Sequence, residues 1–468
     1  MAGGLALDSP AKRVGLAGLT RLRSFSAPAP NPTSASSTYV GKNNGTLVNG
    51  PVVAGKSFDR FIQIWLENTD YATAASSPVF QNLTSRGLLM EGYYGVTHPS
   101  EPNYAAAASG SFWGMGDDSF YAFPQNASTI VDLLEAKNIS WASYQENMPY
   151  DGYTGFNYTE ANYLSGSGNY TYYVRKHNPT ILFDSVASVP ERALRHRNFN
   201  DFAADVNASA LPQWLFITPN LVNDAHDTTI DFTSSWLEYF LYPLLENENF
   251  NNNRTLILLT FDETETYTVN NNIYTLALGN GLPAELIGTT DSTFYTHYSS
   301  LSTVEANWGL GSLGRGDTNK TLANVFSWVA NATGYQNNGL TQQSTDLPLL
   351  NVTGTLPGPA NIQYWTPVLA PNTSAVGAGG GAVFVGPGTN TSLTSWSPQN
   401  LTAAGAKNPE STDPGYIYAN GSLVISTSSA AGAAATGSTG NSTSKSSNAG
   451  KLAVPAVGLF AFGAALLF

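Results

Sequence analysis

Ser100 lies in a segment whose composition could support nucleophilic attack on phosphorus. Residues 97–104 follow a mostly apolar run and precede four successive alanines. Pro102 suits the first turn of a helix, so we expect Ser100 near a helix N-terminus, where N–H groups and the helix dipole favour a phosphate and an ionised alcohol. A serine needs a base or a metal to become a good nucleophile. The competing interpretation is that Ser100 only caps this helix, and the two roles are compatible.

Carboxylates and amides follow two apolar runs at the points where strands should end. Glu67 and Asn68 come after residues 61–66, and Asp262 and Glu263 come after residues 256–260. Buried oxygen ligands of this kind suit a hard divalent cation. Two adjacent carboxylates repel each other, which favours a cation between them or a raised pKa. The alternatives are a helix cap at Asn68 and a solvated turn at Asp262.

The chain has only five histidines, and three of them lie in predicted loops where polar residues gather. The candidates are His98, His177, His226 and His297. A single histidine is more often structural than functional, but its position in such loops favours a part in proton transfer or metal binding. His196 stands between two arginines, and we expect it in a solvated basic turn.

The elements that must position these residues follow an alternating pattern. Residues 61–66, 214–218 and 256–260 are apolar on both faces, as expected of buried parallel strands. Residues 128–135 have helical spacing after a serine that could cap them. The pattern predicts an α/β fold with a mainly parallel sheet flanked by helices, in which sites form at the carboxyl ends of strands.

Composition excludes several classes of function. The 468 residues carry 20 basic and 33 acidic side chains, a net charge of −13, which disfavours nucleic acid as a partner. No cysteine is present, so a disulfide framework and a cysteine nucleophile are both excluded. The sequence also lacks the Arg-His-Gly-x-Arg-x-Pro, Gly-Asn-His-Glu and Gly-x-Ser-x-Gly motifs of other hydrolase mechanisms.

Both ends of the chain differ in composition from its middle. We expect a disordered leader at 1–56, a catalytic domain at 57–335, and a partly irregular extension at 336–425 with short strands near Val383 and Tyr416. A Ser/Thr/Gly-rich stalk at 426–450 precedes an apolar tail at 451–468. Small residues followed by a terminal apolar tail are typical of a GPI signal, and a tail-anchored helix is the alternative.

The compartment indicated by these features is extracellular. About sixteen Asn-x-Ser/Thr sequons are spread over the chain, which predicts N-glycans and a secreted protein held at the cell surface or wall through a lipid anchor. Residues 1–38, however, lack the clear apolar core of a secretion signal.

Taken together, the polar segments resemble the phosphoesterase family, which includes fungal GPI-anchored acid phosphatases, bacterial acid phosphatases and phospholipases C. The resemblance extends over residues 58–335 and depends on the order of several short motifs. These are Glu67-Asn68, Pro99 to Tyr104 with Ser109-Gly110, Lys176-His177-Asn178-Pro179, Pro219-Asn220 with Asp224, His226 and Asp227, Thr260 to Glu263, and His297.

The resemblance implies a core similar to that of alkaline phosphatase and a role for each matching residue. Ser100 would be the nucleophile, with His177 and His226 contacting the phosphoryl group or protonating the leaving group, and Asn103 and His98 binding phosphate. A divalent metal ion would be held by Glu67, Asn68, Asp262, Glu263 and His297. A single hard cation is favoured over two zinc ions, because Asp262 is followed by glutamate rather than histidine.

The implied activity is an acid phosphatase that hydrolyses small phosphate monoesters through a phosphoserine intermediate. Protonated histidines would add positive charge below about pH 6.5, near their unperturbed pKa. Two alternatives remain: a phosphodiesterase or phospholipase C of the same fold, and a non-catalytic wall glycoprotein.

Overall fold

The structure is a computed structural model that describes residues 45–349, 356–419 and 422–425. The chain divides into two units, Met1–Val424 and Ile425–Phe468. The predicted stalk (426–450), the predicted apolar tail (451–468) and residues 1–44 of the leader lie outside the described residues. Within the described part of the chain, none of the helices has the length and apolar character needed to cross a bilayer.

An eight-stranded sheet forms the centre of the first unit, in the order β11-β2-β10-β9-β1-β8-β4-β7. β1 is parallel to both of its neighbours, β8 and β9, and β4 and β7 continue the parallel part. Only β10 runs antiparallel to the strands beside it. The strands of this sheet are β1 (Arg60–Leu66), β2 (Leu88–Met90), β4 (Trp141–Gln145), β7 (His196–Arg197), β8 (Trp214–Thr218), β9 (Thr255–Phe261), β10 (Leu276–Leu278) and β11 (Thr289–Asp291).

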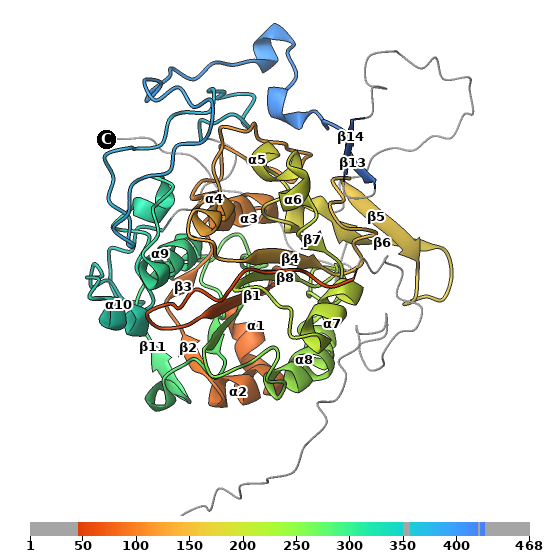
Figure 1. Ribbon diagram of the computed structural model, residues 1–468, viewed down its shortest axis with the longest axis vertical. Helices are drawn as coiled ribbons and strands as arrows, with labels where there is room; N and C mark the ends of the chain where they lie inside the picture. Colours follow the sequence, from red (N-terminus) through yellow and green to blue (C-terminus); the bar gives the residue numbers. More distant parts are fainter. Residues whose placement is uncertain (1–44, 350–355, 420–421, 426–468) are drawn as a thin grey trace, which may run out of the picture. The chain divides into compact units, whose positions relative to one another are not determined.

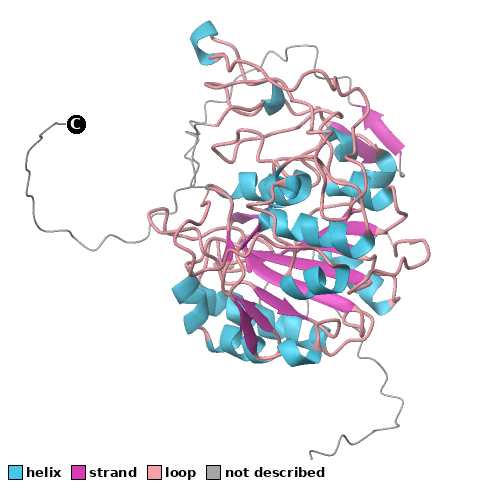
Figure 2. Cartoon of the chain, turned by 90° about the vertical axis from the view of Figure 1, so that its left-hand side faces the viewer, coloured by secondary structure: helices cyan, strands magenta, loops and turns pink. Residues whose placement is uncertain are grey.

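Helices cover both faces of this sheet, and Figures 1 and 2 show the strands between them. One face carries α3 (Ser100–Ser109), α4 (Ile130–Glu135) and α9 (His297–Trp308), whereas the other carries α1 (Tyr71–Ser76), α2 (Pro78–Ser85), α7 (Phe199–Asn207) and α8 (Ile230–Leu245). The remaining helices are α5 (Asp184–Ala187), α6 (Pro190–Ala193) and α10 (Ser327–Thr333). The predicted α/β class, with a mainly parallel sheet flanked by helices, is confirmed.

The central strands are buried on both faces, as their sequences predicted. β8 and β9 are buried along their whole length, and β1 is buried from Phe61 onward. Large aromatic side chains such as Trp65 and Trp214 fill the layers between the sheet and the helices. Burial of each such side chain contributes about 1.5–3 kcal/mol or more, which stabilises the strands whose ends carry the polar residues.

Two local expectations were wrong. The cap of α4 is Thr129 rather than Ser128: its hydroxyl accepts from the N–H of Val131, and Asp132 accepts from the N–H of Thr129. His196 is not in a solvated turn but is fully buried in β7. Its Nε2 lies 2.7 Å from the hydroxyl of Thr180 and its Nδ1 donates to the carbonyl of Ala193 over 2.9 Å, so it joins two segments of the core.

The segment 45–56 differs from the disordered leader that we expected. It has no helix or strand, yet the N–H of Leu47 donates to Asp205 over 2.8 Å and the N–H of Val53 donates to Gln213 over 2.9 Å. These bonds hold the segment against α7 and the start of β8. The ordered part of the chain therefore begins before the first strand.

The remaining strands form three small sheets. They are β3 (Tyr93–Tyr94) with β12 (Tyr295–Thr296), β5 (Asn157–Ala161) with β6 (Asn169–Val174), and β13 (Tyr416–Ala419) with β14 (Ser422–Ile425). The last pair confirms the strand expected near Tyr416, whereas Val383 forms only an isolated bridge with Ser312. The described part of the extension, 336–349 and 356–419, is otherwise mostly irregular.

Glu305 gives the fold a dependence on pH that is separate from the strand ends. It is buried in α9, and burial, the charge of Asp317 and a hydrogen bond with Asp317 raise its pKa well above 4.5. A carboxyl group with a raised pKa binds more protons in the folded state than in the unfolded state. Its stabilising effect is therefore complete below the unfolded value near 4.5 and is lost as pH rises toward the folded value.

Replacing Glu305 by Gln should remove this dependence, because glutamine resembles the protonated acid and does not titrate. We expect Glu305→Gln to match the wild type in melting temperature near pH 4.5 and to exceed it near pH 7.5. Thermal melts of both proteins at the two pH values test this. An equal difference at both pH values would contradict the assignment.

Candidate active site

The carboxyl ends of three adjacent parallel strands bring four carboxylates together. Glu67 directly follows β1, Asp262 and Glu263 directly follow β9, and Asp224 lies in the loop after β8. Backbone bonds hold these ends in register: the N–H of Glu67 donates to the carbonyl of Asp224 over 2.8 Å, and that of Asp262 donates to the carbonyl of Leu66 over 3.0 Å. All four side chains are buried. We call Glu67, Asp224, Asp262 and Glu263 the carboxylate cluster.

Ser100 is the first residue of α3 and points into this cluster. Pro99 precedes it in extended conformation as the N-cap residue and makes no side-chain capping bond. The hydroxyl of Ser100 instead donates to Glu67 Oε2 over 3.1 Å and lies 3.4 Å from Asn68 Oδ1. A role for Ser100 as a cap alone is therefore excluded, whereas its place at a helix N-terminus agrees with the prediction.

The carboxylate cluster holds more negative charge than its surroundings can balance. Burial, and then the charge of the neighbouring carboxylates, raise the pKa values of Asp224, Asp262 and Glu263 well above their usual range. Burial also acts to raise the pKa of Glu67, but His177, with Lys176 and His226, outweighs it and lowers that pKa to about 2. Glu67 is therefore the ionised member, and the other three favour a proton or a cation.

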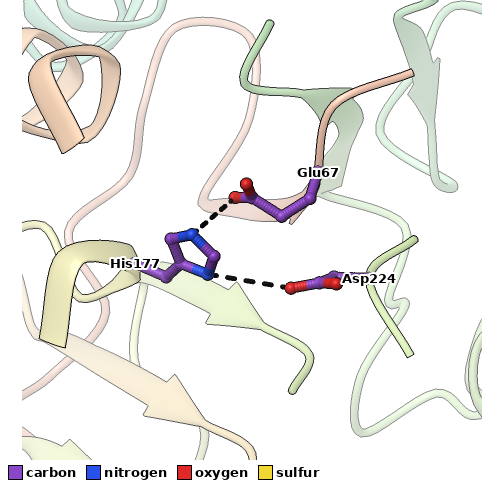
Figure 3. Close-up of side chains that lie close together, drawn as sticks. All are labelled: Glu67, His177 and Asp224. Carbon is purple, nitrogen blue, oxygen red and sulfur yellow. Dashed lines mark ion pairs between the residues drawn. The ribbon is translucent and has the colours of Figure 1, made fainter. Parts of the chain in front are cut away.

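His177 lies between two members of the cluster, as Figure 3 shows. Its Nε2 is 3.2 Å from Glu67 Oε1, and its Nδ1 is 3.7 Å from Asp224 Oδ2. One ligand atom from each of these three residues lies within 4.8 Å of the others, so the group could hold a metal ion. Tyr104, stacked on His177 with ring centroids 5.1 Å apart, donates its hydroxyl to Glu67.

Four polar side chains line the more accessible side of the site. Nδ1 of His226 lies 2.7 Å from Asp227, and its Nε2 lies 3.4 Å from the ammonium group of Lys176. Lys176 also donates to Asp118 over 2.9 Å. We call Asp118, Lys176, His226 and Asp227 the rim.

The loop that carries His226 is strained beside the site. Ala225 has φ of 89°, in a region that a residue with a Cβ rarely occupies. It stands between Asp224 in the cluster and His226 at the rim. The surrounding structure must hold this conformation against its cost, as is common at functional sites.

The predicted phosphate-binding residues lie beside the cluster but are engaged by other groups. His98 Nδ1 is 2.8 Å from Glu263 Oε2, and the ring of Tyr267 stacks on His98 with centroids 4.0 Å apart. Asn103 accepts from the N–H groups of Val96 and Thr97 over 2.9 and 3.0 Å. These bonds make Asn103 a brace of the serine loop, and its phosphate contact stays a prediction.

The predicted metal ligands divide in the same way. Glu67, Asp262 and Glu263 meet in the cluster, and Asn68 joins them by donating to Glu263 over 2.7 Å, which leaves its oxygen toward Ser100. His297 lies behind them, packed on Trp65, and its Nε2 donates to the backbone carbonyl of Asp262 over 2.6 Å. In this arrangement His297 supports the cluster through the backbone, and its coordination of a metal stays a prediction.

The role that we expected for protonated histidines is wrong for His98, because burial lowers its pKa to about 4 and leaves it mainly neutral at pH 5–6. Burial also lowers the pKa of His177, despite the opposing effect of Glu67. The expectation had used the pKa of a solvated imidazole, which burial does not preserve.

Five contributors to the site were absent from the predicted set: Tyr104, Asp118, Lys176, Asp224 and Asp227. Tyr104 stands four residues after Ser100, a spacing that places both on one face of α3 and could have revealed it. Lys176 adjoins His177, and Asp224 lies in the same loop as His226, so both stood within recognised motifs. Their contacts depend on loop paths that periodicity does not determine.

The sequence matches the Phosphoesterase family over residues 49–311, more than half of the chain, and the protein therefore belongs to that family. The acid phosphatase of Aspergillus fumigatus is 49% identical over 308 residues, which is 66% of this chain and 66% of that protein. A probable acid phosphatase of Kluyveromyces lactis is 45% identical over 335 residues, 72% of this chain and 77% of that protein.

More distant similarities were also found. The phosphatidylinositol-3-phosphatase of Mycobacterium tuberculosis is 30% identical over 245 residues, 51% of this chain and 72% of that protein. A protein of the alkaline phosphatase superfamily from Vibrio parahaemolyticus aligns with a TM-score of 0.35 and 11% identity, over 60% of this chain and 71% of that chain. The structural similarity is too low to add to the family assignment.

Removing the amide of Asn103 should loosen the serine loop. Asn103→Ala leaves the buried N–H groups of Val96 and Thr97 without an acceptor, which costs about 2–4 kcal/mol of unfolding free energy. Chemical denaturation of the variant measures this loss. Gln363→Ala, at an exposed position of the C-terminal extension, is the control and should change stability by less than about 0.5 kcal/mol. Equal stabilities of the two variants would contradict the bracing role.

Proposed function

We propose that the protein is an acid phosphatase that hydrolyses phosphate monoesters with Ser100 as its nucleophile. The observation that carries the proposal is the direction of the Ser100 hydroxyl, which faces Glu67 and Asn68 instead of capping its own helix. The similarity to fungal acid phosphatases, which covers 66% of the Aspergillus fumigatus protein, supports the same activity.

In the proposed reaction the oxygen of Ser100 attacks phosphorus, and the bond from phosphorus to the substrate alcohol breaks. The hydroxyl of Ser100 donates a hydrogen bond to Glu67 and Tyr104 donates to the other oxygen of Glu67, so the nucleophile has a fixed direction, and the hydroxyl proton passes to Glu67 as the oxygen attacks. The N-terminus of α3 favours the negative charge of the phosphoryl group. Water then hydrolyses the phosphoserine by the reverse route.

The two histidines of the predicted catalytic set would have different tasks. His177 is buried against Glu67 and Asp224, which suits it to hold these carboxylates in place. His226 is the more exposed of the two and lies at the rim, where the leaving alcohol must depart. We assign to His226 the proton that the leaving alcohol requires.

The cluster fits a divalent cation. Asp262 Oδ2 and Asp224 Oδ2 are buried without a hydrogen-bond partner, and the donor set of carboxylates with the Asn68 oxygen suits a hard ion. Glu67 belongs both to the set predicted from the sequence and to the group with His177 and Asp224. A bound cation would lower the pKa of the Ser100 hydroxyl and neutralise phosphoryl charge.

We further propose that the protein acts outside the cell as a glycoprotein held by a GPI anchor. Sequon asparagines such as Asn82, Asn253 and Asn331 are exposed, as attached glycans require. The apolar tail that would direct anchoring lies at 451–468, outside the described residues. Release of activity from cells by a phosphatidylinositol-specific phospholipase would support the anchor.

Substituting the nucleophile tests the activity. Ser100→Ala removes the attacking oxygen while the rest of the cluster stays, so turnover of 4-nitrophenyl phosphate near pH 5 should fall by about a thousandfold or more. Ser111→Ala, in the loop after α3, is the control and should keep activity. Undiminished turnover in Ser100→Ala would overturn the assignment, and wild-type activity on diesters alone would favour a phosphodiesterase.

Removing a bound cation should lower both activity and stability. Without it the three carboxylates with raised pKa values repel one another as they ionise. We expect dialysis against a chelator at pH 7 to lower the melting temperature, and one of Mg²⁺, Ca²⁺, Mn²⁺ or Zn²⁺ to restore it together with turnover. Identical melting curves and rates before and after dialysis, with no metal in elemental analysis, would exclude the metal.

A further inference from the structure

The rim joins the buried part of the site to solvent. The side chains of the carboxylate cluster, Ser100 and His177 are almost completely buried. The rim residues keep contact with solvent: 14% of the Lys176 side chain is exposed, 26% of Asp118, 23% of His226 and 20% of Asp227. A substrate that approaches Ser100 from this side therefore passes the rim.

The charges along this route would repel an anionic substrate if no cation opposed them. The cluster and the rim together contribute six carboxyl groups, from Glu67, Asp118, Asp224, Asp227, Asp262 and Glu263. Within the described part of the chain, Lys176 is the one lysine or arginine that contacts these side chains. The adjacent Arg175 donates instead to the carbonyls of Thr154 and Tyr121, so its charge is directed elsewhere.

Hydrogen bonds place the ammonium group of Lys176 beside the N-terminus of α3. Asp118 accepts from Lys176 through Oδ2 and from the N–H of Glu101, the second residue of α3, through Oδ1. The ammonium group and the first turn of the helix are thus joined through one carboxylate. A phosphate at this N-terminus would meet both the backbone N–H groups and the Lys176 cation.

The second contact of Lys176 supports the same placement. Asp227 is 2.7 Å from Nδ1 of His226, and the other ring nitrogen, Nε2, faces the ammonium group of Lys176 at 3.4 Å. Lys176 has three N–H donors and uses at most two of them in its contacts with Asp118 and His226. The third is available to a substrate oxygen.

We propose that Lys176 binds the phosphoryl oxygens of the substrate and makes the site prefer dianionic monoesters over monoanionic diesters. The inference rests on the proposed phosphatase function and adds the charge of the preferred substrate. An ammonium group in this partly buried position attracts a second negative charge more strongly than it would in water.

The test compares Lys176→Met with Lys176→Arg in the full-length secreted protein at pH 6.5, above the second phosphate pKa of about 6. For Lys176→Met we expect the KM for 4-nitrophenyl phosphate and the inhibition constant of inorganic phosphate to rise roughly tenfold to a hundredfold, as for a lost charge-assisted hydrogen bond. Lys176→Arg should recover most of this loss. Turnover of bis(4-nitrophenyl) phosphate should change less than turnover of the monoester.

Lys137→Met, at an exposed position after α4, is the matched control and should leave all constants unchanged. Calorimetric titration of inorganic phosphate into Ser100→Ala, with and without Lys176→Met, reads anion binding without catalysis. Constants within twofold of wild type in Lys176→Met, or a fall in kcat alone, would overturn the proposal. If Lys176→Met does not fold, Lys176→Gln replaces it, and phosphate binding equal to that of Lys176→Arg would be the contradicting result.

The two proposals fail in different ways. A wild-type protein that turns over no phosphate ester removes the proposed function itself. If turnover requires Ser100 but phosphate affinity does not change when Lys176 is substituted, only the proposed role of Lys176 is excluded.

Discussion

Repulsion among buried carboxylates is the constraint on which the rest of the site depends. Four acidic side chains end three adjacent strands, and a core this closely packed cannot separate them or expose them to water. The protein meets this constraint by keeping Glu67 ionised among His177, Lys176 and His226, while the other three acids favour a proton or a cation. The same arrangement keeps an acceptor oxygen of Glu67 directed toward Ser100. The burial of these carboxylates therefore costs electrostatic free energy and at the same time orients the proposed nucleophile.

The parallel part of the sheet explains why this arrangement is stable enough to hold such charges. β1 pairs with β9 along its whole length and with β8 over four residues, which fixes the backbone on both sides of Glu67. α9 then closes the site from behind: Thr296 and Ser299 cap its N-terminus, and His297 donates to the carbonyl of Asp262. A shift of one residue in strand register would turn the acidic side chains to the other face of the sheet. Buried residues such as Trp65, whose packing fixes the register, therefore control the geometry of the site indirectly.

The sequence was sufficient for the sheet, for the strand ends and for the position of Ser100, because these follow from two-sided apolar runs and from the proline and alanine residues around the serine. It was insufficient where contacts join distant loops. Lys176 and Asp118 are 58 positions apart, and no local pattern predicts that they meet. Burial was a second obstacle: His196 stands between two arginines yet lies in the core, and His98 has a pKa that composition cannot indicate. Residue propensity and spacing indicate which secondary structure a segment favours. The pKa of a side chain depends instead on the groups that surround it in the folded protein.

Solvent exposure divides the polar residues of the site into two groups, the buried carboxylate cluster and the partly exposed rim. The sequence does not distinguish these two groups. The buried cluster has a fixed geometry, because each carboxylate is held by backbone bonds or by a neighbouring side chain, and it suits attack on phosphorus. The rim is partly solvated, and its hydrogen bonds run from Tyr170 through Asp227, His226 and Lys176 to Asp118. A substitution in the cluster alters charges that cannot be rehydrated, whereas the role proposed for Lys176 implies that a substitution at the rim alters which anion binds. On that proposal the chemistry and the choice of substrate can vary separately, because they depend on different layers of the same strand ends.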